Sequence, residues 1–595
     1  MSALRTAIVG LFFVQVATGV VLMTAYSPST AAAWGSVWYI QTQVAGGWLI
    51  RGVHHFSSDA MLILLAVALV RCLLTRAYQA RGWRLWSALL IGLGVVLAVS
   101  LTGHLLPWDQ EGFWGTTVRT NILAKTPVIG ETLRRLFLGG VELGQLTLPR
   151  FYTLHILLLP ALLVLLYRLQ NRDSRGAANR SGERKRPDAV VNVAPPLVGG
   201  AAALTLASVM LCVVLAAVLG ATTLLDAPAD RTATDYPARP EWHTLFLFQW
   251  LKFFQGPTAE IVGAVVVPSL VILLLLLFPL LPRIFSPQRA HRAAMIFSGT
   301  FVFGATLLTG VNLWHDRNPS DASVAAIRAK QGDGGKLSKE DEAILRARQF
   351  NTQRIQAART ADRAVQLAAI EGIPPEGPLA LLARDPQTRG PKLFAANCAS
   401  CHRFDGHNGL GEVPGEPPNA SDLKGFASYD WIRGLLDNPM DDRFLGRTRT
   451  PEGEPAHTRM DRFVRERLET ADDAARAQVA AEYDAAATFL TDQSGANQSG
   501  ERKQPDPALV EKGREVFMTL CNECHSFDGE RAGTTRAPEM KDYGSVEWLK
   551  LMIAEPDHET RYRSAGLERA RMPRFKEKLS EQEIELLARW IYNDR

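Results

Sequence analysis

The sequence predicts an all-α protein in which a seven-helix transmembrane bundle precedes two small helical domains. Three observations lead to this fold class. Residues 1–314 contain seven long apolar runs, residues 315–595 are polar and rich in helix formers, and two CxxCH motifs, CASCH and CNECH, lie in the polar half. The net charge of +5 over 595 residues is too small to indicate a nucleic-acid partner.

Each apolar run is long enough to cross a bilayer as one helix. The runs cover approximately residues 6–25, 52–74, 86–106, 152–169, 197–225, 259–281 and 294–314. Ala31-Ala32-Ala33 follows the first run and could suggest a cleavage site. That run is longer than the apolar core of a signal peptide and further spans follow it, so we interpret it as a retained helix.

The two CxxCH motifs predict covalent attachment of two c-type haems. Cys398 and Cys401 precede His402, and Cys521 and Cys524 precede His525. A histidine directly after the second cysteine is typical of haem c, whereas a redox dithiol or half of a zinc site does not need it. The other two cysteines lie in or beside membrane runs and are expected to be packing residues.

Each c haem also needs a distal ligand, for which methionine is the usual residue. We expect Met572 in ARMPRF to serve the second haem, with Met540 and Met552 as weaker candidates. For the first haem we expect Met460, in the matching context TRMDRF, with Met440 as the alternative. Helix-forming sequence follows both R-M-x-R-F contexts, which makes simple core filling a poor explanation for these methionines.

The distribution of basic residues predicts the orientation of the spans. Arg and Lys cluster in the second-to-third, fourth-to-fifth and sixth-to-seventh connections, whereas residues 26–50 contain neither. By the positive-inside rule, the other connections and all residues after 315 lie on the outer, positive (p) side. We therefore expect a multi-pass protein of the bacterial inner (cytoplasmic) membrane with its haem c domains in the periplasm.

His54 and His155 indicate a third haem, within the bundle. Each follows a p-side loop and lies near the p-side end of its span. Polar residues inside a membrane are functional candidates, and two neutral imidazoles on facing helices can bind one iron from both sides. Arg51, one turn from His54, is placed to meet a haem propionate.

Several motifs resemble cytochrome b of the Rieske/cytochrome b complexes. The stretches VQVATG, GGWLIRGVHH, TGHLLPWDQEGFWG and LTLPRFYTLH resemble its four-helix haem part, and residues 227–254 resemble its quinol-site loop. The resemblance is closest to the b6f type, with both parts fused. It implies a four-helix domain at 1–175 and a three-helix domain at 190–314, followed by a stalk (315–388) and cytochrome c domains at 389–494 and 506–595.

The resemblance also implies residue roles. His54 and His155 match the ligands of the p-side haem b, and Gly19 and Gly103 match glycines that let the porphyrin approach the helices. The quinol-site motif comes later in the chain.

Pro240, Glu241 and Trp242 match the Pro-Glu-Trp-Tyr motif of the quinol-oxidation pocket, with His243 replacing the tyrosine. Glu241 would accept a quinol proton, and we expect desolvation to raise its pKa.

The positions that would hold a second haem b, near the negative (n) side, depart from the family. Fourteen residues beyond the ligands, about 21 Å along a helix, the chain has Ala68 and Gln170, or its neighbour Leu169, instead of histidine. The two matching glycine positions are Arg5 and Leu89. We therefore expect one haem b, which leaves a Q cycle incomplete unless another subunit supplies the missing branch.

The resulting expectation is an enzyme: the cytochrome b–c subunit of a quinol:cytochrome c oxidoreductase. It would need a separate Rieske iron–sulfur protein, because the haems use all four p-side cysteines, and a soluble or oxidase-bound cytochrome as acceptor. A homodimeric core is expected. The alternative is a non-catalytic, haem-bearing electron conduit, which the missing n-side ligands favour and the Pro-Glu-Trp loop opposes. A redox sensor has no supporting output domain in the sequence.

Overall fold

The computed structural model describes residues 2–79, 83–180, 198–219, 225–332, 334–415, 417–447, 459–469, 472–495, 505–530, 537–561 and 572–593. It divides into two compact units, Met1–Pro319 with Ala343–Leu381, and Ser320–Glu342 with Leu382–Arg595. Helices dominate both, and the described residues form only isolated β-bridges beside them. The all-α prediction is confirmed.

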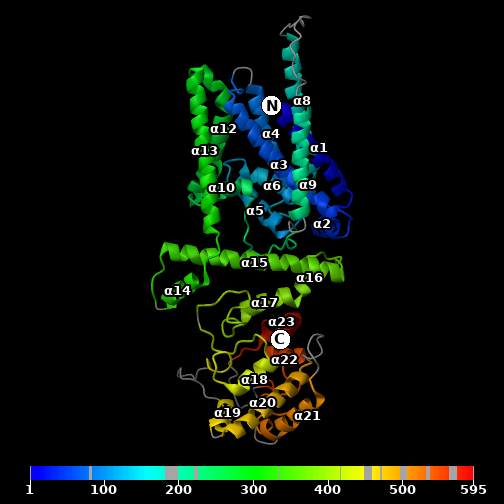
Figure 1. Ribbon diagram of the computed structural model, residues 1–595, viewed down its shortest axis with the longest axis vertical. Helices are drawn as coiled ribbons and strands as arrows, with labels where there is room; N and C mark the ends of the chain where they lie inside the picture. The colour runs from blue at the N-terminus through cyan, green and yellow to red at the C-terminus, as the bar shows by residue number, and fades with distance from the viewer. Residues whose placement is uncertain are drawn as a thin grey trace. The chain divides into compact units, whose positions relative to one another are not determined.

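Seven helices of the first unit are long and apolar enough to cross a membrane, as predicted. Figure 1 shows them as a bundle. Their segments are α1 (Ser2–Met23), α3 (Gly47–Leu74), α4 (Trp83–His104), α7 (Thr147–Thr153) with α8 (Leu159–Arg180), α9 (Val198–Leu219), α11 (Pro257–Ile261) with α12 (Val267–Leu277), and α13 (Pro287–His315).

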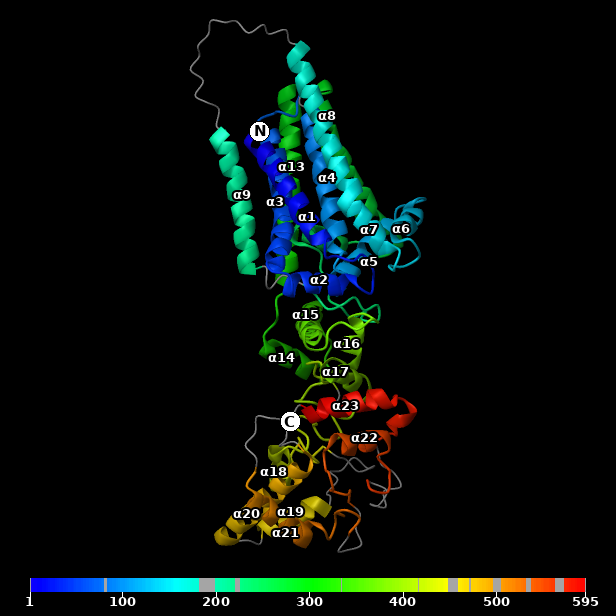
Figure 2. The same cartoon turned by 90° about the vertical axis from the view of Figure 1, so that its right-hand side faces the viewer.

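The first five membrane helices pack against one another within the bundle. Helices α1, α3 and α9 pack against one another, α3 packs against α4, and α4 packs against α8 (Figure 2). A π turn at Leu154–Leu158 joins α7 to α8 and contains His155. Single π turns within helices frequently occur at functional sites, because the extra residue redirects the side chains around it.

Short segments beyond the ends of the spans hold the 227–254 loop, the stretch that resembles a quinol-site loop. Asp109 caps α5 (Gln110–Ala124) by accepting a hydrogen bond from the Gly112 amide at 2.9 Å. Next to it, the Gln110 amide donates to the Ala227 carbonyl at 2.9 Å and the Ala229 amide donates to that of Trp108 at 3.1 Å. These bonds join the end of α4 to the loop that leads to α10 (Leu245–Leu251).

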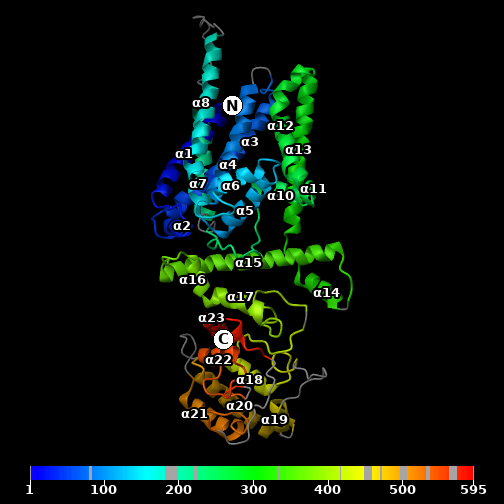
Figure 3. The ribbon, with the colours of Figure 1, turned by 180° about the vertical axis from the view of Figure 1, so that it is seen from behind.

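A long helix, α15 (Lys339–Glu371), follows α14 (Asp321–Gly332) and ends before the PPEGP breaker, beyond which lies α16 (Leu379–Arg384). Figure 3 shows α15 crossing the direction of the membrane helices. Within the first unit, Ile373 packs over Gly35 and Gly377 lies beside Ala31, so the segment after α15 is anchored on α2 (Ala33–Thr42) and the turn before it.

The second unit contains both CxxCH segments in a single hydrophobic core. Its helices are α17 (Pro386–Asn397), α18 (Tyr429–Asp437), α19 (Arg459–Glu469), α20 (Asp473–Gln493), α21 (Pro507–Val516), α22 (Val546–Ala554) and α23 (Glu581–Asn593). Helix α17 packs against α23, and α20 packs against α21 (Figures 1 and 2). The helix before each CxxCH motif therefore pairs with the terminal helix of the other segment.

Candidate functional site

His54 and His155 face each other inside the membrane unit. Their ring centroids are 6.1 Å apart, with an angle of 65° between the ring planes. Nδ1 of His54 lies 2.9 Å from Thr18 Oγ1, and Nδ1 of His155 lies 3.0 Å from the Val99 carbonyl oxygen. These bonds orient each ring and leave Nε2 for a metal. Two imidazole nitrogens each about 2 Å from one ion place the ring centres roughly 6 Å apart, so the pair fits a haem iron.

Gly19 and Gly103 lie against these two rings. A Cβ added at Gly19 would lie 3.3 Å from His54 Cε1, and one added at Gly103 would lie 2.6 Å from His155 Cε1. The expected reason for these glycines was clearance for the porphyrin. The structure adds a second reason, because a side chain at either position would push on the histidine that is expected to bind the iron.

Arg51, the expected propionate partner, donates a hydrogen bond from Nη1 to Gln41 Oε1 at 2.7 Å. It lies one turn before His54, in the first turns of α3. Its role toward a propionate stays a prediction.

The four positions that depart from the family pattern for a second haem b carry apolar, amide or guanidinium side chains. Ala68 is 1% exposed and part of the apolar core, and Leu89 packs within two apolar clusters of the bundle. Arg5 lies over the ring of Tyr167, with its guanidinium carbon 4.9 Å from the ring centre. No imidazole occupies any of the four corresponding positions, which include Gln170.

Glu241 pairs with a histidine that the sequence analysis did not identify. Its Oε1 lies 3.0 Å from Nδ1 of His104, the last residue of α4. This bond holds the pKa of Glu241 down to about 2, outweighing the effect of burial. The expected direction, a pKa raised by desolvation, is therefore wrong for the conformation in the structure. The signal available in the sequence was the position of His104, directly after Gly103 in TGHLLPWDQ.

Further acidic groups surround this pair. One ligand atom each from His104, Glu111 and Glu241 lies within 4.8 Å of the others. Burial raises the pKa of Glu111 to about 7, even though His104 lowers it. Burial also raises the pKa of Asp226 to about 6, and this carboxylate accepts a 2.6 Å hydrogen bond from the Tyr236 hydroxyl. Groups with such pKa values can exchange protons near neutral pH.

Polar groups without hydrogen-bond partners also gather on the segments next to Glu241. Among the described residues, neither ring nitrogen of His243 has a hydrogen-bond partner, and neither do the buried Thr116 hydroxyl on α5 and the Gln249 carbonyl oxygen on α10. Buried polar groups are normally satisfied. Their presence on three neighbouring segments is what a site for a polar ligand or ordered water would show. Trp242 is half exposed, and its Nε1 lies 3.2 Å from Asp59 Oδ1.

Arg239, just before Pro240, anchors this loop to the end of α13 and to α15. Its guanidinium makes two 2.9 Å hydrogen bonds to the carboxylate of Asp316. Its Cζ lies 3.8 Å from the centre of the Phe350 ring. The buried Asn351 side chain donates to the Asp316 backbone carbonyl at 3.0 Å. The first part of α15 thus braces the 227–254 loop.

Both CxxCH motifs form the turn that haem attachment requires. The His402 amide donates to the Cys398 carbonyl at 2.8 Å, and the His525 amide donates to that of Cys521 at 2.8 Å. His402 Nδ1 lies 2.8 Å from the Ser421 carbonyl oxygen, and His525 Nδ1 lies 2.8 Å from that of Pro538. As in the membrane pair, Nε2 is left for an iron. In each motif the second cysteine, Cys401 or Cys524, is more exposed than the first.

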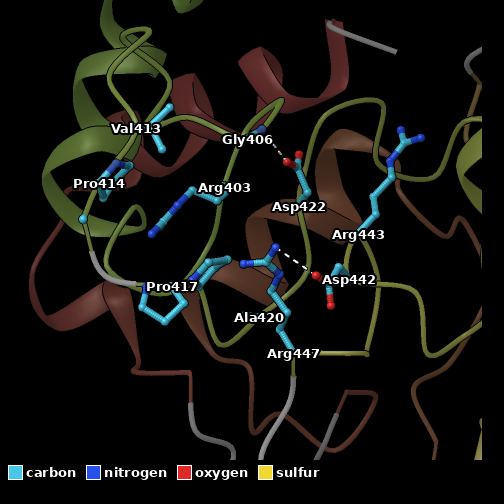
Figure 4. A pocket seen from close by; sticks show the side chains of 12 residues that line it. Arg403, Gly406, Val413, Pro414, Pro417, Ala420, Asp422, Asp442, Arg443 and Arg447 are labelled. Atoms are coloured by element: carbon cyan, nitrogen blue, oxygen red, sulfur yellow. Dashed lines mark hydrogen bonds and ion pairs between the residues drawn. The ribbon is translucent and has the colours of Figure 1, made fainter. Parts of the chain in front are cut away.

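A cavity of about 360 Å³ lies beside the first motif (Figure 4). Three arginines, Arg403, Arg443 and Arg447, line it together with Asp422 and Asp442. Arg447 pairs with Asp442 at 2.9 Å, while the Gly406 amide donates to Asp422 at 2.7 Å. The excess of guanidinium groups suits the cavity to carboxylates, such as those of a haem.

The expected methionine ligands lie at the edge of the core. Met460, Met540 and Met572 are partly buried against it, and Met552 is buried within it. Met460 lies in α19, and Met572 lies just before α23. Their assignment as distal ligands, and the choice of Met460 over Met440, stay predictions.

Models of known protein families match both halves of the chain. A family model described as Cytochrome b/b6/petB matches residues 3–170. Models described as Cytochrome c and as Cytochrome C oxidase, cbb3-type, subunit III match residues 387–481 and 508–591.

Several curated relatives are cytochromes b6. That of Cyanidium caldarium is 39% identical over 159 residues, which cover 26% of this chain and 72% of that protein. That of Porphyra purpurea is 41% identical over 152 residues, covering 25% and 70% respectively. A solved structure titled "Hyperthermophilic respiratory Complex III" is similar at 21% identity and a TM-score of 0.45, covering 60% of this chain and 91% of that chain.

The seven spans, the paired membrane histidines and the two CxxCH turns define a multi-pass membrane protein of electron transport, whose cytochrome b and cytochrome c segments imply haem b and haem c. Through its N-terminal part, the chain belongs to the cytochrome b/b6 family, and cytochrome c segments follow in its C-terminal half.

Proposed function

We propose that the chain is the cytochrome b–c subunit of a quinol:cytochrome c oxidoreductase that oxidises quinol on the p side of a bacterial inner membrane. His54 and His155 would hold one haem b, and the two CxxCH motifs would hold two haems c. When bound, these haems supply one-electron transfer. A separate Rieske protein, a soluble or oxidase-bound cytochrome acceptor and a second copy of the chain complete the proposed complex.

The contact between Glu241 and His104 carries this proposal. His104 follows Gly103, and Gly103 lies against the ring of His155. The proton-accepting carboxylate of Glu241 is therefore linked, through the end of α4, to His155, which would bind haem. Quinol oxidation needs this combination, because the substrate loses protons and electrons together, whereas a passive electron conduit needs no acid–base group.

Glu241 would work by exchanging partners. While His104 holds it, its carboxylate has a pKa of about 2 and is too weak a base for a quinol hydroxyl. If Glu241 turns to the quinol, it loses the interaction that lowers its pKa, and burial then raises that value. The carboxylate becomes a competent proton acceptor, and on returning to His104 it can release the proton toward Glu111.

Four n-side positions favour a single haem b. Ala68, Gln170, Arg5 and Leu89 stand where the family pattern has two histidines and two glycines. The same observation favours the second candidate function, a haem-bearing conduit in which quinol is oxidised elsewhere.

A Glu241→Gln variant distinguishes the two functions. We expect quinol:cytochrome c turnover of the purified complex to fall by about 10²–10⁴-fold, the usual contribution of a general base. The haem b and haem c absorbance should stay unchanged, because Glu241 pairs with His104 and not with His54 or His155. Unchanged turnover would exclude the enzyme and leave the conduit.

A further inference from the structure

We propose that the two c haems are ligated crosswise. The haem attached at Cys398 and Cys401 has His402 and Met572 as its axial ligands, and the haem attached at Cys521 and Cys524 has His525 and Met460. This proposal depends on the cytochrome c segments alone and is independent of quinol oxidation.

The first haem segment is completed by the last helix of the chain. A Cβ added at Gly390 in α17 would collide with the Trp590 side chain of α23. The Trp590 ring stacks on Phe404, with centroids 4.2 Å apart and planes at 25°. Arg389 and Glu583 form a 3.0 Å ion pair between the same two helices. Helix α23 thus lies against the helix that leads into Cys398 and against the second residue after His402.

The second haem segment is completed by α20 in the same way. A Cβ added at Gly513 in α21 would collide with the backbone of Ala485 and the Phe489 side chain of α20. The Phe489 ring lies 5.9 Å from that of Phe517 and 5.5 Å from that of Phe527, the second residue after His525.

Helix α19 brings Met460 toward the second motif. Arg467, seven residues beyond Met460 in this helix, forms an ion pair with Glu482 of α20. It also lies over the ring of Tyr483, with Cζ 5.9 Å from the ring centre. Because α19 packs on α20, and α20 lies against the helix that leads into Cys521, these two helices carry Met460 toward the second motif.

Met572 belongs to the body formed by α22 and α23. Arg574 pairs with Asp557, and the buried Phe575 begins a short turn that packs on both helices. Because α23 lies against the first motif, this body carries Met572 toward His402.

Both arrangements give each iron a histidine and a methionine, so the ligand type cannot distinguish them. Removing one of the two c haems distinguishes the two arrangements. In the full chain with Cys521→Ala and Cys524→Ala, only the first c haem remains. We expect Met572→Ala to abolish the methionine–iron charge-transfer absorption of that haem and Met460→Ala to retain it. The proposal would be overturned if Met460→Ala abolished this absorption and Met572→Ala retained it.

A second measurement keeps both haems and needs no ligand change. In the Arg389→Lys chain, a zero-length carbodiimide reagent can join the introduced lysine side chain to Glu583 as an amide. We expect the linked peptide in protein that migrates as a single chain, and its loss in the matched Arg389→Gln control. Folded two-haem protein that gives no linked peptide, or gives it only between two chains, would contradict the exchange within one chain.

Discussion

At the scale of single residues, glycines and hydrogen bonds fix the two histidines that face each other in the bundle. Thr18 and the Val99 carbonyl hold the Nδ1 atoms, while Gly19 and Gly103 leave room for the rings. The histidines and glycines could be predicted from the sequence, because their spacing and depth match a family pattern. The hydrogen bonds could not, since they join residues 36 and 56 positions apart.

Gly103→Ala tests this arrangement. The new methyl group would lie 2.6 Å from His155 Cε1, so the ring must move away from its partner. We expect overpacking to weaken haem b retention by about 1–3 kcal/mol. The ratio of haem b to haem c in the purified protein measures the loss. Gly94→Ala is the matched control, since nothing lies within 4 Å of a Cβ at this other α4 position. Equal haem ratios in the two variants would contradict this role for Gly103.

The pairing of His104 with Glu241 gives a second prediction at this scale. Replacing His104 by Phe removes the largest cause of the low pKa of Glu241 and leaves burial, which raises it. A larger fraction of Glu241 is then protonated in acid, and only the ionised form accepts a proton. We expect the acidic limb of the pH profile of kcat/KM to move up by about 1–2 pH units.

A His291→Gln variant serves as the control, because His291 packs beside Tyr78 at another site, near the beginning of α13. It should leave the profile in place. An acidic limb that does not move in His104→Phe would show that the charge of Glu241 does not limit quinol oxidation.

At the scale of elements, α15 and the π turn show what local sequence patterns can and cannot predict. The helix itself follows from composition and from the PPEGP breaker. Its contact with the quinol-site loop does not, because Phe350 reaches Arg239 across more than 100 residues. The π turn around His155 is also invisible in hydropathy, since the apolar run continues through it unchanged.

Phe350→Leu tests whether α15 braces the loop. Loss of the stacked ring removes a cation–π interaction worth about 0.5–2 kcal/mol, which should loosen Arg239 and the neighbouring Pro240-Glu241. We expect the KM for quinol to rise by about 2–30-fold with the haem spectra unchanged, and Phe350→Tyr to restore it. Ile370→Ala, at a 77% exposed position of the same helix, is the control. A KM equal to that of the control would exclude the brace.

At the scale of the whole molecule, the chain combines a membrane unit with a haem c unit whose two segments share one core. The seven spans and both CxxCH motifs could be predicted, because hydropathy and motif spacing are local properties. The exchange of helices could not. Gly390 and Gly513, and likewise Phe404 and Phe527, occupy equivalent places in the two segments, so local patterns fit either partner helix equally well.

The central claim is a quinol-oxidising chain with one haem b and two haems c. Pyridine haemochrome spectra of the purified chain test it most directly, because the reagent replaces the axial ligands and counts b and c haems separately. We expect about one haem b for two haems c, as the single membrane pair His54–His155 and the two CxxCH motifs require. Two haems b per chain would contradict the account, because the n-side positions would then have to bind a haem without histidines.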